Sequence, residues 1–146
     1  VLYPRGALSL EQIREAVLNV ARYDLDGLRE AMLAGDVARL TRTIDGLQQE
    51  GEAPLLVLWA MTEDVRVLAQ INAGLAGRQS LDLLLKEARV WGVRQPLVRR
   101  AVQRIDGRRA TAALAHAARI DRMIKGLASG DVWDEFRQLG LHIAVG

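Results

Sequence analysis

The stretch Pro54-Leu55-Leu56-Val57-Leu58-Trp59-Ala60-Met61 decides the fold of this chain. Proline is favoured at the first position of a helix, where its missing N–H has no partner to lose, so a helix is predicted to begin at Pro54. Every residue from Leu55 to Met61 is apolar, and this helix therefore has no polar side over roughly two turns. Such a helix must be covered on most sides, which predicts the central helix of a bundle with Trp59 in the core.

Two shorter helices are predicted before this stretch. Ser9 and Gln12 have the spacing of a capping box, in which each side chain bonds to the backbone N–H of the other residue, so a helix is expected at about 10–20. Asp24 is predicted to cap a second helix, and Gly35 to end it in the left-handed conformation that glycine adopts readily. A break is therefore expected near residues 22–24.

Turn-forming residues divide the rest of the chain. Gly74 and Gly77 are predicted to break the central helix, Pro96 to open a later one, and Gly130 to end the longest clean apolar pattern. Further helices are expected at about 36–51, 80–88, 96–105, 110–127 and 131–143, with the first of these and the central helix forming an antiparallel hairpin. Every element is helical, so the predicted fold class is all-α, a compact bundle of about seven helices.

Composition limits what the chain can be. Its 146 residues suffice for one domain, and half are hydrophobic although only 4% are aromatic, which is typical of a helix bundle. The absence of cysteine excludes disulfides and thiolate zinc sites and favours a cytoplasmic protein. No apolar run approaches the roughly 20 residues of a membrane span, so no membrane is expected among its partners. The chain opens with Val1, which we interpret as a start inside a longer protein.

Catalytic signatures are missing from the sequence. There is no phosphate-binding loop motif, and the two histidines, His116 and His142, lack metalloprotease spacing. The acid pairs at 63–64 and 134–135 are adjacent on helices and point roughly 100° apart, so they do not form a general acid/base pair. We predict no catalytic residues, no cofactor and no metal site. The alternative, a small helical enzyme, would need a convergent polar pocket.

Charge is distributed unevenly along the chain. Residues 1–70 hold seven arginines and eleven acids, whereas residues 86–109 hold eight basic residues and two acids. A basic block opposite an acidic one indicates a surface that faces nucleic acid or a complementary contact with a partner subunit. An ordinary solvated helix face is an equally weighted alternative.

Trp91 lies inside the basic block and gives it a second feature. Arginine suits phosphate and an aromatic ring can stack on an unpaired base, so Trp91 with Arg89 and Arg94 forms a candidate site for nucleic acid. The alternative is that Trp91 fills a seam between two helices, which is the commoner fate of a tryptophan. Trp133, like Trp59, is predicted to lie in the core. The remaining candidates for a DNA-facing surface are Arg99, Arg100, Arg104, Arg108 and Arg109.

Four motifs, in this order and spacing, resemble the delta subunit of the bacterial DNA polymerase III clamp loader. Each is a weak helical signature alone, but together they cover most of the chain and their order is specific. They are ARYDLDGLREAMLAGD at 21–36, EGEAPLLVLWAMTEDVRVLAQ at 50–70, ARVWGVRQPLV at 88–98 and AARIDRMIKGLASGDVWDEFRQLGLHIA at 117–144.

The resemblance implies a domain organisation and a role. Delta subunits have two N-terminal AAA+-like domains and then a helical collar, so residues 1–23 are expected to be the tail of the preceding AAA+ lid domain and residues 24–146 the collar. In that family the collar assembles delta with delta-prime and gamma/tau subunits, and delta opens the sliding clamp through an N-terminal domain that this chain lacks. The chain would then be a non-catalytic part of a DNA polymerase holoenzyme.

The resemblance also implies roles for two individual residues. The tryptophan of the family's R-V-W motif falls on Trp91, and the inside of the collar lies near the template strand, which implies that the basic block faces primer-template DNA in the assembled complex. Lys125, in the segment R-I-D-R-M-I-K-G, becomes a candidate for a subunit interface. The alternative function is a stand-alone helical nucleic-acid-binding domain that uses residues 86–109.

Overall fold

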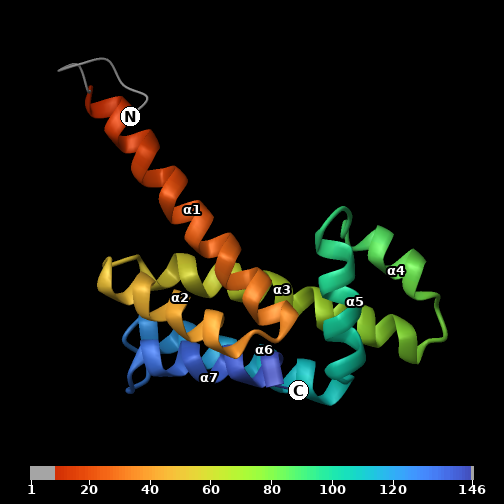
Figure 1. The fold of residues 1–146 in the computed structure, drawn as a ribbon. Coiled ribbons are helices and arrows are strands. Elements are labelled where there is room, and N and C mark those ends of the chain that lie inside the picture. Colours follow the sequence, from red (N-terminus) through yellow and green to blue (C-terminus); the bar gives the residue numbers. More distant parts are fainter. Residues whose placement is uncertain (1–8, 146) are drawn as a thin grey trace.

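The computed structural model describes residues 9–145, and for residues 17–23 it describes the backbone only. The described residues form seven α-helices and no strand, as the sequence predicted (Figure 1). The helices are α1 (Leu10–Ala34), α2 (Val37–Gln49), α3 (Pro54–Ala76), α4 (Leu81–Glu87), α5 (Arg94–Arg104), α6 (Gly107–Ile124) and α7 (Val132–Val145).

Helix α3 occupies the centre of the bundle, which confirms the prediction made from its apolar first turns. It begins at Pro54 and contacts α1, α4, α5, α6 and α7, with its longest contact along α6. Val57, Met61 and Leu68 have no exposed surface. Helix α2 packs against α7. Gly140 of α7 has no side chain there, and Leu40 of α2 can therefore approach the α7 backbone closely.

The predicted break near residues 22–24 is wrong, because α1 is one continuous helix from Leu10 to Ala34. Residues 22–24 include no glycine or proline that would stop a helix, and Asp24 lies within α1 and does not cap a new helix. Both ends of α1 are as predicted. Ser9 and Gln12 form the capping box, and Gly35 ends the helix with φ of 78°. Figure 1 shows the N-terminal half of α1 projecting away from the bundle.

Two other predicted helix ends differ from the structure. Gly74 does not break α3; it lies within the helix where a Cβ atom would collide with Leu84 of α4, so it serves close packing. Helix α6 ends at Ile124 and not near Gly130. Gly126 adopts φ of 78° and the Leu127 N–H donates to the Arg122 carbonyl at 2.8 Å, which closes the helix with a Schellman motif. Leu127 is consequently exposed.

A buried carboxylate joins three helices. Asp64 of α3 has no exposed side-chain surface, and it accepts two hydrogen bonds of 3.0 Å from Arg29 of α1. Arg94, at the start of α5, donates a third hydrogen bond to the same carboxylate. The hydrogen bond with Asp64 raises the pKa of Arg29 further. The cluster fixes α5 against α3, because a buried charge is stable only when it is paired and hydrogen-bonded.

The two tryptophans predicted to lie in the core behave differently. Trp133 is partly buried against the core, and its ring meets Phe136 edge-to-face with centroids 5.3 Å apart. Trp59 is 59% exposed, so its core prediction is wrong. An apolar turn of α3 has more sides than its neighbours α1 and α6 can cover, and Trp59 lies on the side left open.

Candidate functional site

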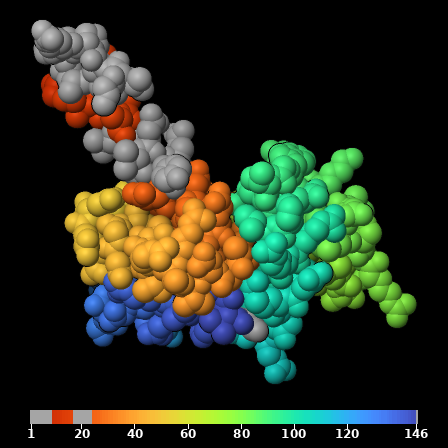
Figure 2. All heavy atoms as spheres, in the orientation of Figure 1, coloured from red at the N-terminus to blue at the C-terminus, as the bar shows by residue number. Residues whose placement is uncertain are grey.

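The basic block at residues 86–109 lies at one end of the molecule, on α4, α5 and the start of α6 (Figure 2). Trp91 lies in the loop between α4 and α5 and is 60% exposed, so it does not fill a seam between helices. The preceding Val90 is buried and anchors this loop. Arg89 and Gly92 both adopt the left-handed conformation, with φ of 58° and 65°. The loop therefore turns on either side of Trp91.

Three of the candidate arginines are used inside the domain. Arg94 binds the buried Asp64, and Arg99 pairs with Asp82 of α4. Arg104 donates to the carbonyl oxygen of Ile143 at 3.1 Å and to that of Leu33 at 3.0 Å. It therefore caps the C-terminal ends of α7 and α1 together, a role that the sequence pattern did not reveal. Burial lowers the pKa of Arg104, and the nearby charges of Arg100 and Arg109 lower it further.

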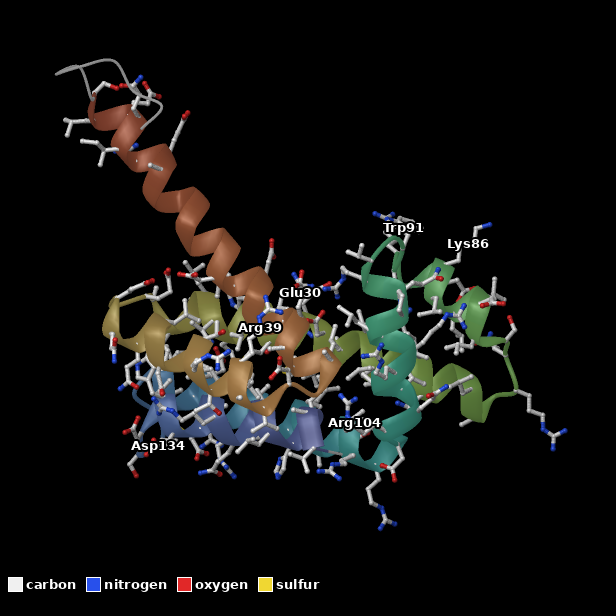
Figure 3. The ribbon with its side chains drawn as sticks, in the orientation of Figure 1. Glu30, Arg39, Lys86, Trp91, Arg104 and Asp134 are labelled. Atoms are coloured by element: carbon white, nitrogen blue, oxygen red, sulfur yellow. The ribbon has the colours of Figure 1, made fainter. Side chains whose placement is uncertain are left out.

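The other candidates remain available to a ligand. Arg89, Arg100, Arg108 and Arg109 form no ion pair with any side chain that the structure describes. They do not form one cluster, however. Arg89 and Trp91 lie before α5, whereas Arg108 and Arg109 follow it and line a groove of about 340 Å³ with His142. Figure 3 shows the separation, with Trp91 and Arg104 labelled at opposite ends of α5.

A second hollow lies between α3 and α6, away from the basic block. Its volume is about 290 Å³, and the exposed Trp59 forms one wall. Lys125 lies at its edge, because its ammonium group pairs at 2.8 Å with Asp121 of the lining. We call this hollow the Trp59 groove; its lining includes Trp59, Thr62, Arg66, Leu114, Ala118 and Asp121.

The described residues contain no group of three or more His, Cys, Asp or Glu side chains placed to hold a metal ion. Near the C-terminal helix, His116 lies 3.1 Å from Glu135 of α7, and Arg119 binds the same carboxylate at 2.8 Å. The hydrogen bond from Arg119 and that with His116 lower the pKa of Glu135. Among the described helices, none has the length and apolar character of a membrane span.

The described surface of this helical bundle carries exposed tryptophans, arginines without an ion-pair partner and two grooves. The family model described as "Processivity clamp loader gamma complex DNA pol III C-term" matches residues 26–145. The chain therefore belongs to this family, the C-terminal domain of clamp-loader delta subunits.

Two named relatives agree with this assignment. The chain is 25% identical to DNA polymerase III subunit delta of Escherichia coli strain K12 over 141 residues, which is 97% of the chain and 41% of the relative. It is 22% identical to DNA polymerase III subunit delta of Haemophilus influenzae over 153 residues, covering 99% of the chain and 44% of the relative. The chain thus spans less than half the length of the relatives it matches.

Proposed function

We propose that residues 24–146 are the collar of a clamp-loader delta subunit, with residues 1–23 as the tail of a preceding AAA+ lid domain. In this role the chain is a non-catalytic accessory part of DNA polymerase III in the cytoplasm. It assembles delta with the delta-prime and gamma/tau subunits, so that the complex loads sliding clamps on primed DNA. The sliding clamp itself would be bound only through a delta domain outside this chain.

The observation that carries this proposal is the family match over residues 26–145 of a chain whose fold is entirely helical in its described part. Two features of the surface support it. Leu56 and Trp59 stay exposed on the most apolar helix, as expected of a domain with a partner. Lys125, the interface candidate, lies at the edge of the Trp59 groove.

Mass measurement in solution tests the assembly role. The chain is mixed with purified delta-prime and gamma subunits at micromolar concentration, and the mass of the eluting species is measured by light scattering. We expect a species heavier than any component. Components that elute separately at their own masses would contradict the proposal.

A second candidate role, contact with primer-template DNA, is supported by Trp91 and the unpaired arginines. Trp91 and Arg89 are both exposed in the loop between α4 and α5, which suits stacking on a base with a cation near the phosphate. A salt titration distinguishes DNA binding by the chain alone from DNA binding by the assembled loader. If the chain alone binds primer-template DNA with an affinity that falls steeply with salt, it is a stand-alone nucleic-acid-binding domain. If only the assembled loader does so, the basic block acts as part of the collar.

A further inference from the structure

The most apolar turn of the chain is only half covered. Val57, Leu58 and Met61 are buried, whereas Leu56 and Trp59 are exposed. Isolated apolar side chains on a surface need no explanation. Trp59 differs because it borders a hollow, and a large aromatic side chain beside a hollow is the usual anchor of a protein interface.

Small and apolar side chains form part of the Trp59 groove, beside the polar Thr62, Arg66 and Asp121. Leu114 and Ala118 of α6 face Trp59 of α3 across the hollow. The two helices pack against each other along much of their length. A groove between two packed helices accepts the ridge of a third helix, which is the common mode of helix association.

Two polar groups of the groove have no partner among the described residues. Thr62 Oγ1 is buried without a hydrogen bond, a state that costs free energy unless a ligand or water supplies one. Arg66 is exposed and forms no ion pair with any described side chain. Asp121 differs, because Lys125 already neutralises it. Because Thr62 Oγ1 has no exposed surface, Arg66 is the group that an occupant can reach, and an occupant that complements the groove would bring a carboxylate toward it.

These requirements favour a protein helix over nucleic acid or a second copy of this chain. Nucleic acid would meet a partly apolar lining, the carboxylate of Asp121 and the single unpaired cation Arg66, too little for backbone binding. A second copy related by a two-fold axis would present the same groove, whose one carboxylate, Asp121, is already paired with Lys125. An amphipathic helix with an apolar stripe and an acidic flank complements both the apolar side chains of the groove and Arg66.

We propose that the Trp59 groove binds an amphipathic helix of a neighbouring clamp-loader subunit, which places an apolar side chain against Trp59 and a carboxylate against Arg66. This inference rests on the proposed function and specifies the face of the collar that assembly uses. It also gives Lys125 its place, as the residue that neutralises Asp121 so that an acidic partner is not repelled.

Titration calorimetry of the chain with purified delta-prime and gamma subunits tests the inference. Trp59→Ala is expected to weaken binding to one of these subunits by about 30-fold, as truncation of a central aromatic does. Arg66→Glu is expected to weaken it by about tenfold. Trp91→Ala is the matched control, since Trp91 is exposed to the same extent, and it should change the affinity less than twofold. Circular dichroism should show unchanged melting for all three variants, because the side chains are exposed.

Each outcome decides the question. Affinity that is unchanged in both Trp59→Ala and Arg66→Glu, while the unaltered chain binds, overturns the inference and leaves the proposed function standing. An equal loss in Trp91→Ala also overturns it. An unaltered chain that binds neither subunit overturns the inference together with the proposed function. Self-association that Trp59→Ala abolishes would show a second copy to be the occupant, and would overturn the inference as well.

Discussion

Trp59 and Trp91 are exposed to nearly the same extent, 59% and 60%, but their surroundings differ. Trp59 projects from the central helix beside a groove with a partly apolar lining. Trp91 projects from a loop that also carries the unpaired Arg89. Exposure of an aromatic side chain therefore does not identify its partner; the neighbouring side chains do. Apolar neighbours suit a protein surface, and unpaired cations suit phosphate.

The largest expected effect comes from breaking the connection between the two regions. Asp64 of α3 holds Arg94 beside the Trp91 loop, so Asp64→Ala leaves two guanidinium groups without their carboxylate. We expect a loss of about 3–5 kcal/mol in the free energy of unfolding, toward the lower end because both arginines keep some contact with water. Urea denaturation measures it. Asp82→Ala, which removes the exposed pair with Arg99, should change stability little. Equal losses in the two variants would contradict this role of Asp64.

Removing the indole of Trp91 tests the DNA side of the comparison. In an assembled loader, Trp91→Ala is expected to weaken primer-template binding by about tenfold, since one stacked base contributes roughly 1–3 kcal/mol. Fluorescence anisotropy at several salt concentrations measures the affinity and its slope with salt. The slope should stay unchanged, because the indole carries no charge, whereas Arg89→Gln should reduce it by about one.

The exposed neighbour Val93 provides the control for Trp91. Val93→Ala changes the same loop without removing an aromatic ring, and it should leave DNA affinity unchanged. A Trp91→Ala loader that binds primer-template DNA as tightly as the unaltered one would exclude Trp91 from the DNA surface.

A smaller effect separates structural arginines from available ones within the basic block. Arg104→Gln removes hydrogen bonds to the carbonyl groups of Leu33 and Ile143, and we expect it to lower stability by about 1–2 kcal/mol. Arg108→Gln should leave stability unchanged, because Arg108 has no described ion-pair partner. Thermal melting of both variants measures the difference. The same melting temperature for both would show that the cap formed by Arg104 contributes nothing.

The smallest effect is expected on the α6–α7 face, which belongs to neither tryptophan region. The pKa of Glu135 is lowered in the folded chain, chiefly by Arg119, so its ionised form stabilises the fold above the ordinary glutamate pKa. That stabilisation is lost as the pH falls through the lowered pKa. Melting between pH 6 and 3, about the range in which carboxylates titrate, should fall about 2 °C further in the unaltered chain than in Glu135→Gln. Parallel melting curves would contradict this contribution.

Several features of the fold were predicted from the sequence because they depend on near neighbours. The capping box of Ser9 and Gln12, the start of α3 at Pro54 and the left-handed Gly35 each involve residues within a few positions of one another. The break expected near Asp24 is wrong because the neighbouring residues did not determine it. Asp favours caps over helix interiors, which suggested a break, but residues 22–24 include no glycine or proline that would end the helix.

The candidate site was predicted less well. The sequence located the basic block and identified Trp91, but it assigned the same role to all its arginines. Arg94 and Arg104 are instead engaged by partners 30 and 71 residues away. The one signal available was Asp64, an acid within an apolar helix, since a buried carboxylate requires a cation.

The sequence by itself determined the helical fold class, the central position of α3 and the family, because periodicity, caps and motif order are written in consecutive residues. Only the tertiary structure decided that Trp59 is exposed, that Trp91 points outward and that some arginines are already engaged. The physical reason is that the apolar pattern of a helix does not specify which of its sides the neighbouring helices cover. Which side remains open depends on helices that the chain brings together from far apart.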